Sequence, residues 1–432
     1  MTTAEPDLPA FPLDAGLDVS LGTAVSISLD STAGALLDNL FEGLRRRPDL
    51  ETAELRAWDA ADRYLLDTAA PWLSARPAQV VVVDDTHGAL TLGARTLGAQ
   101  SVRVHQDSLV AQRALAANAR DGGPRDSSAR DSGARDSGAG DSSAGDGPAS
   151  DIAVTAIEQY PLDTVMTPDA RLALLRLPRS LDRLDAVARA LATSAHPDLV
   201  LIAGNMVKHM SPSQNDVLRA SFERVDVSLA RGKARLLTAR GPRVREPLAP
   251  ARGYDPDHVL HIVALPGVFA GASLDIGTRA LLDAADQLPE FATAIDLGCG
   301  SGVLAAFLAR RAPGARIIAS DVSAVAVQSA ALTAEANGVR VETVHDDGLS
   351  QQPDASADLV VMNPPFHVGA AVHTGIALRL FAEAGRVLRS GGQLWSVWNS
   401  HLDFSSALER AVGTTRQAAR TPKFTVTVSR KP

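Results

Sequence analysis

Hydrophobic residues in the first half of the chain occur in short runs, separated by stretches of helical spacing. Runs of this length predict buried strands, and the helical spacing between them, for example over residues 181–195, predicts helices. The runs are residues 79–85, 101–105, 152–155, 172–177 and 199–203, and the half ends with further strands around residues 225–239. Strands that alternate with helices pack as a mostly parallel sheet covered by helices, so this half predicts one doubly wound α/β domain.

Two further helices are expected before the first of these strands. One begins near Thr32 and ends at the three arginines of residues 45–47. The other begins at Glu54, because Leu55, Trp58 and Leu65 recur at intervals that place them on one helix face.

The second half repeats the plan of the first. Its predicted strands are residues 293–297, 316–321, 339–345, 358–362 and 393–398, and its predicted helices are residues 303–311, 324–336 and 375–388. Residues 424–428 alternate between apolar and polar side chains, which is typical of an antiparallel edge strand. The chain therefore predicts two tandem doubly wound, Rossmann-like α/β domains that arose by duplication.

A length of 432 residues agrees with two domains, because it exceeds what one ordinary core accommodates. We interpret the chain as an N-terminal extension, a first domain, a linker rich in proline and arginine, and a second domain, at residues 1–50, 51–245, 246–256 and 257–432. Residues 120–149 form a near-perfect five-residue repeat of glycine, serine and charged residues. Such a segment cannot bury a core, so we expect a disordered loop inserted in the first domain, and favour this over a binding segment.

Composition narrows the class of protein. Hydrophobic residues make up 45% of the chain and charged residues 21%, as in soluble globular proteins. The apolar runs are far shorter than the roughly 20 residues of a membrane helix, and the pattern of a signal peptide is missing. Cys299 is the single cysteine, which excludes a disulfide framework and a cysteine zinc site. We therefore expect a cytoplasmic protein without membrane segment or metal, and the sequence does not specify its oligomeric state.

The net charge of -8 argues against indiscriminate binding of nucleic acids, which depends on neutralising phosphates. A local basic patch would still suffice for RNA. The C-terminal region offers basic residues for one, and a solvated face is the equal alternative. These residues are Arg410, Arg416, Arg420, Lys423, Arg430 and Lys431.

A glycine turn follows the first predicted strand of the second half. Gly298, Gly300 and Gly302 lie where the chain leaves this strand, on either side of Cys299. Glycines there permit a tight turn and the close approach of a ligand, and ligands of open α/β sheets bind at the carboxyl ends of strands. Val303 stands where a dinucleotide-binding turn has its third glycine, which weakens the dinucleotide interpretation.

Acidic residues end or follow three successive strands beside this turn. Asp296 is placed to accept a hydrogen bond from the ammonium group of a methionine moiety, and Asp321 suits two ribose hydroxyls. Asp346 or Asp347, after the third strand, suits an adenine amino group. Together with the glycine turn, these acids predict a site for S-adenosylmethionine.

The sequence Asn363-Pro364-Pro365-Phe366 follows another strand. The Asn363 side-chain oxygen and the Pro364 carbonyl can accept hydrogen bonds from a planar exocyclic amino group, and the two prolines hold these acceptors in place. Phe366 can stack on a flat substrate, a contact worth ~1–3 kcal/mol per base. Methyl transfer requires in-line approach, so positioning carries much of the catalysis. The two motifs together predict an S-adenosylmethionine-dependent methyltransferase for a base or amide NH2 group, with Asn363 also close to the cofactor.

These motifs resemble those of the two-domain bacterial ribosomal-RNA guanine-N2 methyltransferases, which belong to class I of the S-adenosylmethionine-dependent enzymes. The matching stretches are residues 265–282, 296–302, 363–369, 399–402 and 422–424, and residues 54–66 resemble the N-terminal domain of the large-subunit type. The resemblance covers most of the chain apart from the first fifty residues and the repeat. Histidine after Asn-Pro-Pro-Phe is typical of this group, whereas relatives that modify glutamine in release factors usually carry tyrosine in place of Phe366.

The resemblance implies a catalytic second domain and a first domain that has lost cofactor binding and helps to hold RNA. Ribosomal RNA or a ribosomal subunit would be the partner, and His367, His401 and Lys423 match positions that would contact the base or phosphates. In the first domain, residues 84–89 stand in place of the glycine turn, and Leu177-Pro178-Arg179 replaces Asn-Pro-Pro-Phe. A purely structural first domain is the alternative.

The favoured function is transfer of a methyl group from S-adenosylmethionine to the exocyclic N2 amine of one guanine in ribosomal RNA. Its base must be unpaired or extruded, because this amine lies on the pairing edge. A second hypothesis is methylation of a glutamine amide or of adenine, and a third is a non-catalytic ribosome-assembly factor. Phe366 and His367 argue against the second, and the intact acids and Asn363 argue against the third.

Overall fold

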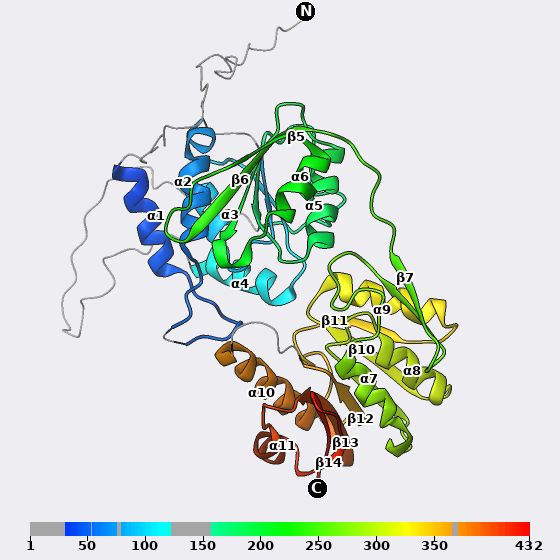
Figure 1. Cartoon of the computed structure of the whole chain (residues 1–432). Helices are drawn as coiled ribbons and strands as arrows, with labels where there is room; N and C mark the ends of the chain where they lie inside the picture. Colours follow the sequence, from blue (N-terminus) through cyan, green and yellow to red (C-terminus); the bar gives the residue numbers. More distant parts are fainter. Residues whose placement is uncertain (1–30, 53, 76–78, 122–156, 365–369) are drawn as a thin grey trace, which may run out of the picture.

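The computed structural model describes residues 31–52, 54–75, 79–121, 157–364 and 370–432, without the side chains of residues 31 and 370–374. The predicted strand at 152–155 and nearly all of the repeat at 120–149 lie outside these residues. The described residues form two α/β domains that lie side by side, joined by one extended segment along the edge of the molecule (Figure 1).

The first domain is built on a six-stranded sheet with helices on both faces. Its strand order is β2 (Val102–His105), β1 (Val80–Val83), β3 (Leu172–Arg176), β4 (Val200–Met206), β6 (Ala234–Pro242) and β5 (Phe222–Val227). The first four strands are parallel, and β6 and β5 are antiparallel additions. One face is covered by α1 (Ser31–Gly43), α2 (Ala60–Ser74), α3 (Ala89–Thr96) and α4 (Leu109–Asp121). The other face packs on α5 (Leu181–Thr193) and α6 (Ser213–Ser221).

The second domain has a seven-stranded sheet of the same plan. Its strand order is β11 (Glu342–His345), β10 (Arg316–Asp321), β9 (Thr293–Leu297), β12 (Ala357–Met362), β13 (Leu388–Asn399), β15 (Phe424–Arg430) and β14 (Thr414–Arg420). One face packs on α7 (Ile276–Asp283), α8 (Val303–Arg311) and α9 (Ala324–Ala336). The other packs on α10 (Ala370–Val387) and α11 (Ser405–Ala411). The bounds of β9, α8, β10 and α9 are those expected from the sequence.

The two sheets share one topology, as the predicted duplication requires. In order across each sheet, β2, β1, β3, β4, β6 and β5 of the first domain correspond to β10, β9, β12, β13, β15 and β14 of the second. In both sheets the last two strands form an antiparallel pair. The place of β11 in the first domain is taken by Gln159, which forms a parallel bridge with Val104 of β2. The fold class of two tandem doubly wound domains is therefore confirmed.

The structure corrects three boundaries. Residues 1–50 are not all an extension, because Leu37 and Phe41 of α1 are buried in the core of the first domain. Glu54 lies outside α2, which begins at Ala60 because the Asp59 carboxylate caps its free N–H groups. Residues 246–256 are not all linker, since β7 (Ala251–Asp255) pairs with β8 (Leu260–Ala264) and this hairpin packs on α9.

The edge-strand prediction was also wrong. The strand β15 is antiparallel, but it lies inside the sheet between β13 and β14. The sequence of β14 gave no signal, because its side chains are mostly exposed or half-buried and lack strict alternation. In the described part of the chain, no helix has the length and apolarity needed to cross a membrane. Within those same residues, no group of His, Cys, Asp or Glu side chains is arranged to hold a metal ion.

Candidate active site

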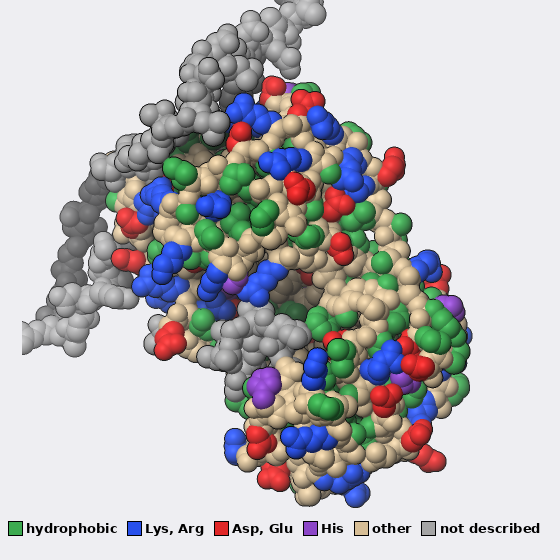
Figure 2. Space-filling view, viewed as in Figure 1, with side chains coloured by type: hydrophobic (Ala, Val, Ile, Leu, Met, Phe, Trp, Pro, Cys, Tyr) green, Lys and Arg blue, Asp and Glu red, His purple; other side chains and the backbone are tan. Residues whose placement is uncertain are grey.

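A cavity of about 960 Å³ lies between the two domains, at the carboxyl ends of β9, β10 and β12. Figure 2 shows a hollow between the two lobes. Both domains line this cavity, and a smaller one of about 40 Å³ shares Gly298, Gly300 and Asn363 with it. The predicted cofactor and substrate motifs thus meet at one place, although they lie far apart in the sequence.

The glycine turn is fastened to the neighbouring strand and presents open backbone to the cavity. The Gly298 amide donates to the Ser320 carbonyl at 2.8 Å, and the Gly300 amide donates to the Asp321 carboxylate at 3.0 Å. Gly298 and Gly300 have φ angles of 73° and 53°, and a Cβ atom on either would meet no atom within 4 Å. Both glycines are therefore needed for the turn, and the space beside them is free for a ligand.

Gly302 has a different role from the other two glycines. A Cβ atom there would lie 2.6 Å from the Cα and Cβ atoms of Ala330, so the glycine lets α8 pack closely on α9. Gly302 lines neither cavity, although the sequence pattern had grouped it with the cofactor-binding residues.

The acid at the end of β9 is almost fully buried. Asp296 is 1% exposed, lines the smaller cavity and accepts a hydrogen bond from the Ala305 amide at 3.0 Å. Burial, and to a smaller extent the charge of Asp321, raises the pKa of Asp296 to about 7. A cation placed beside Asp296 would favour its ionised form, which suits the ammonium group expected there.

Asp321 and Cys299 share this environment. The Asp321 carboxylate accepts from the Gly300 and Ser323 amides, at 3.0 and 2.9 Å, and burial raises its pKa. Cys299 lines the smaller cavity, and burial also raises the pKa of its thiol well above the ordinary value. A protonated thiol is a poor nucleophile, so Cys299 serves here as a small apolar residue.

Asp346 and Asp347 both line the larger cavity but have different partners. Asp346 accepts hydrogen bonds from the amides of Asp347 and Gln351, each at 2.8 Å, and from the Ser350 hydroxyl. Asp347 instead forms an ion pair with Arg379 of α10, at 2.6 Å between Oδ1 and Nη2. Asp346 thus holds its own turn together, and Asp347 is the better candidate to contact an adenine ring.

Asn363, directly after β12, is held by two residues that belong to neither sequence motif. Its Nδ2 atom donates to Asp275 Oδ2 at 2.9 Å and to Thr278 Oγ1 at 3.0 Å. An ionised carboxylate can only accept hydrogen bonds, so the amide must turn its nitrogen toward Asp275 and its oxygen away. The oxygen of Asn363 is thereby left for a ligand.

Asp275 is itself fixed by the start of α7. Its Oδ2 atom accepts from the amides of Gly277 and Thr278, at 2.8 and 3.2 Å, and so caps the helix. A Cβ atom on Gly277 would lie 3.3 Å from Asn363 Nδ2 and 3.2 Å from the Phe424 ring, so glycine permits this close approach. An acid directly before residues 276–282, in which Ile276, Ala280 and Leu281 recur at helical spacing, is an N-cap signal that could have revealed Asp275.

The remaining predicted site residues divide into three groups. Pro364 lines the larger cavity, where Phe269, Asn399 and Phe424 also lie. Pro365, Phe366 and His367 lie outside the described residues. His401 and Lys423 are exposed on neighbouring turns, joined by the Ser400 amide and the Lys423 carbonyl at 2.8 Å, and neither lines the cavity.

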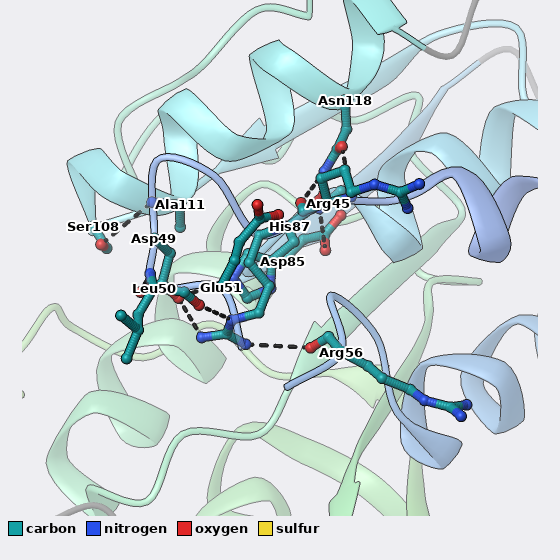
Figure 3. Close-up of polar contacts among 12 residues, drawn as sticks. Arg45, Asp49, Leu50, Glu51, Arg56, Asp85, His87, Ser108, Ala111 and Asn118 are labelled. Atoms are coloured by element: carbon teal, nitrogen blue, oxygen red, sulfur yellow. Dashed lines mark hydrogen bonds and ion pairs between the residues drawn. The ribbon is translucent and has the colours of Figure 1, made fainter. Parts of the chain in front are cut away.

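In the first domain, the protein's own side chains occupy the turn that corresponds to the glycine turn. The Asp85 carboxylate accepts from the amides of Gly88 and Thr91, at 3.0 and 2.8 Å. His87 contacts Asp49 at 3.1 Å, and Asp49 also pairs with Arg46. Figure 3 shows this group, with Asp49, Asp85 and His87 labelled.

The pair of residues that holds Asn363, Asp275 and Thr278, also has a counterpart in the first domain. Asp59 caps α2 as Asp275 caps α7, and Asp62 follows three residues later, as Thr278 does. Between them they hold Arg176 of β3: Asp59 accepts from its two terminal guanidinium nitrogens at 2.8 and 2.9 Å, and Asp62 lies 3.2 Å from Nη1. A guanidinium only donates hydrogen bonds, so this copy cannot accept them from an amino group.

Comparison with known proteins identifies relatives for both domains. Residues 259–428 match the family model "Methyltransferase small domain", and residues 37–137 and 150–243 match "RLMG N-terminal domain". The chain is 36% identical over 390 residues to the Ribosomal RNA large subunit methyltransferase G of Stutzerimonas stutzeri, covering 89% of this chain and 95% of that protein. The protein of the same name from Streptomyces coelicolor is 34% identical over 393 residues, covering 89% and 96%.

A solved structure shares the two-domain architecture. It is a 16S rRNA N2 methyltransferase (RsmC) from T. thermophilus, in complex with AdoMet and guanosine. It superposes with a TM-score of 0.66 at 21% identity, over 89% of this chain and 97% of that chain. At this identity, the similarity establishes a common fold.

Proposed function

This chain belongs to the ribosomal RNA large subunit methyltransferase G family, and from that premise we propose that it methylates ribosomal RNA. It transfers a methyl group from S-adenosylmethionine to the exocyclic N2 amine of a guanine, in the RNA of the large ribosomal subunit. A ribosomal substrate would place the protein in the cytoplasm.

The observation that carries this proposal is the oriented amide of Asn363 beside the glycine turn. Asp275 and Thr278 take both N–H groups of this amide, so its oxygen is an acceptor held ready before a substrate enters. Together with the Pro364 carbonyl it would accept the two N–H groups of the guanine amine and direct the nitrogen lone pair. Such preorganised groups lower a reaction barrier because they need no rearrangement during the reaction.

The residues around the glycine turn fit S-adenosylmethionine, which supplies an electrophilic methyl group on its sulfonium. Gly298 and Gly300 leave open space in the cavity where a Cβ atom would lie. Asp296 would bind the ammonium group, Asp321 the ribose hydroxyls and Asp347 the adenine amino group. The cavity of about 960 Å³ is large enough for this cofactor and an extruded base together.

The first domain is proposed to help hold RNA rather than to methylate it. Its counterparts of the glycine turn and of Asn363 are occupied by Asp85 and Arg176. It nevertheless lines the cavity with Arg56 and Arg179, whose positive charge suits phosphate groups of an entering strand. Phe269 and Phe424 line the same cavity from the second domain and would stack on the extruded base.

The experiment that tests the proposal uses tritiated S-adenosylmethionine with purified ribosomal subunits and matching naked RNAs from cells that lack this protein. We expect label in N2-methylguanosine, recovered from large-subunit RNA. Label in N6-methyladenosine, or in protein alone, would refute the assignment of the acceptor. Unlabelled RNA with the cofactor still bound would point to a protein or DNA acceptor, whereas failure to bind S-adenosylmethionine would favour the non-catalytic assembly factor.

Asn363→Ala separates catalysis from cofactor binding. We expect methyl transfer to fall by about 100-fold or more, since one preorganised hydrogen-bonding group is worth about that much. Affinity for S-adenosylmethionine should change little. Equal loss of both properties would contradict the role assigned to Asn363.

A further inference from the structure

The two domains touch through corresponding turns. The turn after β2 and the turn after β10 form an antiparallel bridge between Ser108 and Ser323. The Leu109 amide donates to the Val322 carbonyl at 2.9 Å, and the Ala324 amide donates to the Asp107 carbonyl at 3.1 Å. Each serine begins the helix that follows its strand, so this backbone contact is nearly two-fold symmetric. Its form is that of an isologous dimer interface, as expected if a dimer became one chain.

One side chain breaks this symmetry. Asp107 precedes Ser108, whereas the apolar Val322 precedes Ser323. The Asp107 carboxylate crosses the domain boundary, accepting from the Ser323 hydroxyl at 2.6 Å through Oδ2 and from the Val325 amide at 2.9 Å through Oδ1. An acid of the first domain thus caps α9 of the second, together with Ser323.

The start of α9 is also the support of the cofactor site. The Ser323 amide donates to Asp321 Oδ1 at 2.9 Å, and the Gly300 amide donates to Asp321 Oδ2 at 3.0 Å. A continuous series of hydrogen bonds therefore runs from Asp107 through Ser323 and Asp321 to the glycine turn.

The same turn of the first domain forms part of the cavity wall. Gln106, Ser108, Val110 and Ala111 line the larger cavity, on which Asp321, Val322, Asp346 and Asp347 also border. The side chain of Arg113 reaches to 4.0 Å from Asp346. The first domain therefore borders the cavity beside the proposed cofactor site.

We propose that Asp107 is a positioning residue for the cofactor, through which the degenerate first domain sets the affinity of the catalytic domain for S-adenosylmethionine. This inference rests on the proposed function, since it concerns the same cofactor site. The first domain would then have a role separate from RNA binding. Without the Asp107 carboxylate, the turn that carries Asp321 would be free to move.

The test measures S-adenosylmethionine binding by titration calorimetry on the full chain, without RNA. We expect Asp107→Ala to bind on the order of tenfold more weakly, a typical coupling between two sites. Asp107→Asn should bind within about threefold of the wild type, because its amide can still accept from Val325 and donate to the Ser323 hydroxyl. Asp216→Ala is the matched control, since this exposed acid of α6 pairs with Arg219 away from the cavity.

Kinetics provide the second readout. In methyl transfer to ribosomal RNA, Asp107→Ala should raise the KM for S-adenosylmethionine by the same factor and leave kcat at saturating cofactor within about twofold. Ser323→Ala removes the hydroxyl that donates to Asp107. The double variant Asp107→Ala, Ser323→Ala should therefore lose less affinity than the product of the two single losses.

Unchanged affinity in Asp107→Ala, with a wild type that binds, would overturn the inference and leave the proposed function standing. A fall in kcat at saturating cofactor with an unchanged KM would also overturn it, because that would place the effect on the reaction. A wild-type protein that does not bind S-adenosylmethionine would overturn both.

Discussion

The orientation of the Asn363 amide can be tested without substituting Asn363 itself. The double variant Asp275→Ser, Thr278→Val removes both acceptors that hold its Nδ2 atom, at 2.9 and 3.0 Å. Serine is as good an N-cap as aspartate, so α7 should still begin at Ile276, but its shorter side chain cannot reach the amide. Valine has nearly the shape of threonine and lacks the hydroxyl.

The magnitude follows from the two hydrogen bonds. The bond to a charged carboxylate is worth ~1.5–3 kcal/mol and the bond to a hydroxyl ~0.5–1.5 kcal/mol, so the wild-type amide is inverted in roughly one molecule in thirty or fewer. In the variant the two orientations become similar in energy. Population alone would reduce kcat about twofold, while full loss of a preorganised acceptor costs about 100- to 1,000-fold. Because the variant keeps Asn363 but no longer holds it, we expect kcat to fall about 10- to 100-fold.

The assay is single-turnover methyl transfer to large-subunit RNA with saturating tritiated S-adenosylmethionine, together with calorimetric cofactor binding and thermal unfolding. Thr278→Ser keeps the hydroxyl and should remain within about threefold of the wild type. Asp286→Ser makes the same change at an exposed acid beyond α7 and serves as the control. A double variant with wild-type kcat would refute the reasoning, as would one that loses cofactor affinity as much as it loses kcat.

Two further predictions concern the cofactor site. Gly302→Ala places Cβ 2.6 Å from Ala330 and should destabilise the fold by ~1–3 kcal/mol in denaturant unfolding. Gly300→Ala meets no atom, so it should destabilise the fold less, through its φ of 53° alone, and should mainly weaken S-adenosylmethionine binding. The reverse pattern would contradict the assigned roles. Because the pKa of Asp296 is raised to about 7 by burial, the acid is protonated below that pH and its ammonium-binding charge is lost. Cofactor affinity should therefore rise by about tenfold as pH increases through 7, and Asp296→Asn should remove this part of the pH dependence. If the affinities of the wild type and the variant respond identically to pH, Asp296 does not bind the ammonium group.

The sign of the stability effect of Asp296 is opposite to that of a carboxylate in a salt bridge. Its folded pKa of about 7 lies above the ordinary value of 3.8, so the folded state binds more protons than the unfolded state between these pH values. Its contribution to the free energy of unfolding therefore falls as pH rises from about 4 to 7. A bound cation beside Asp296 would offset this loss, which links cofactor binding to stability near neutral pH.

The sequence by itself determined the features that depend on neighbouring residues. The alternation of apolar runs with helical spacing predicted two doubly wound domains, and the bounds of α8 and α9 agree with the structure. The glycine turn and the acids at strand ends were readable because each occupies a few consecutive residues with a fixed backbone requirement. Parallel strands then bring their carboxyl ends to one edge, so these separate motifs had to meet.

Only the tertiary structure decided which side chains hold these motifs in place. Asp275 lies 88 residues from Asn363, and Asp107 lies 218 residues from Val325, so no local pattern connects the partners. The separate role of Gly302 likewise appears only where α8 meets Ala330 of α9. Local sequence sets backbone conformation, which makes elements and turns predictable. The orientation of an amide or a loop depends on atoms from distant segments that are brought into contact only when the two domains have folded and packed.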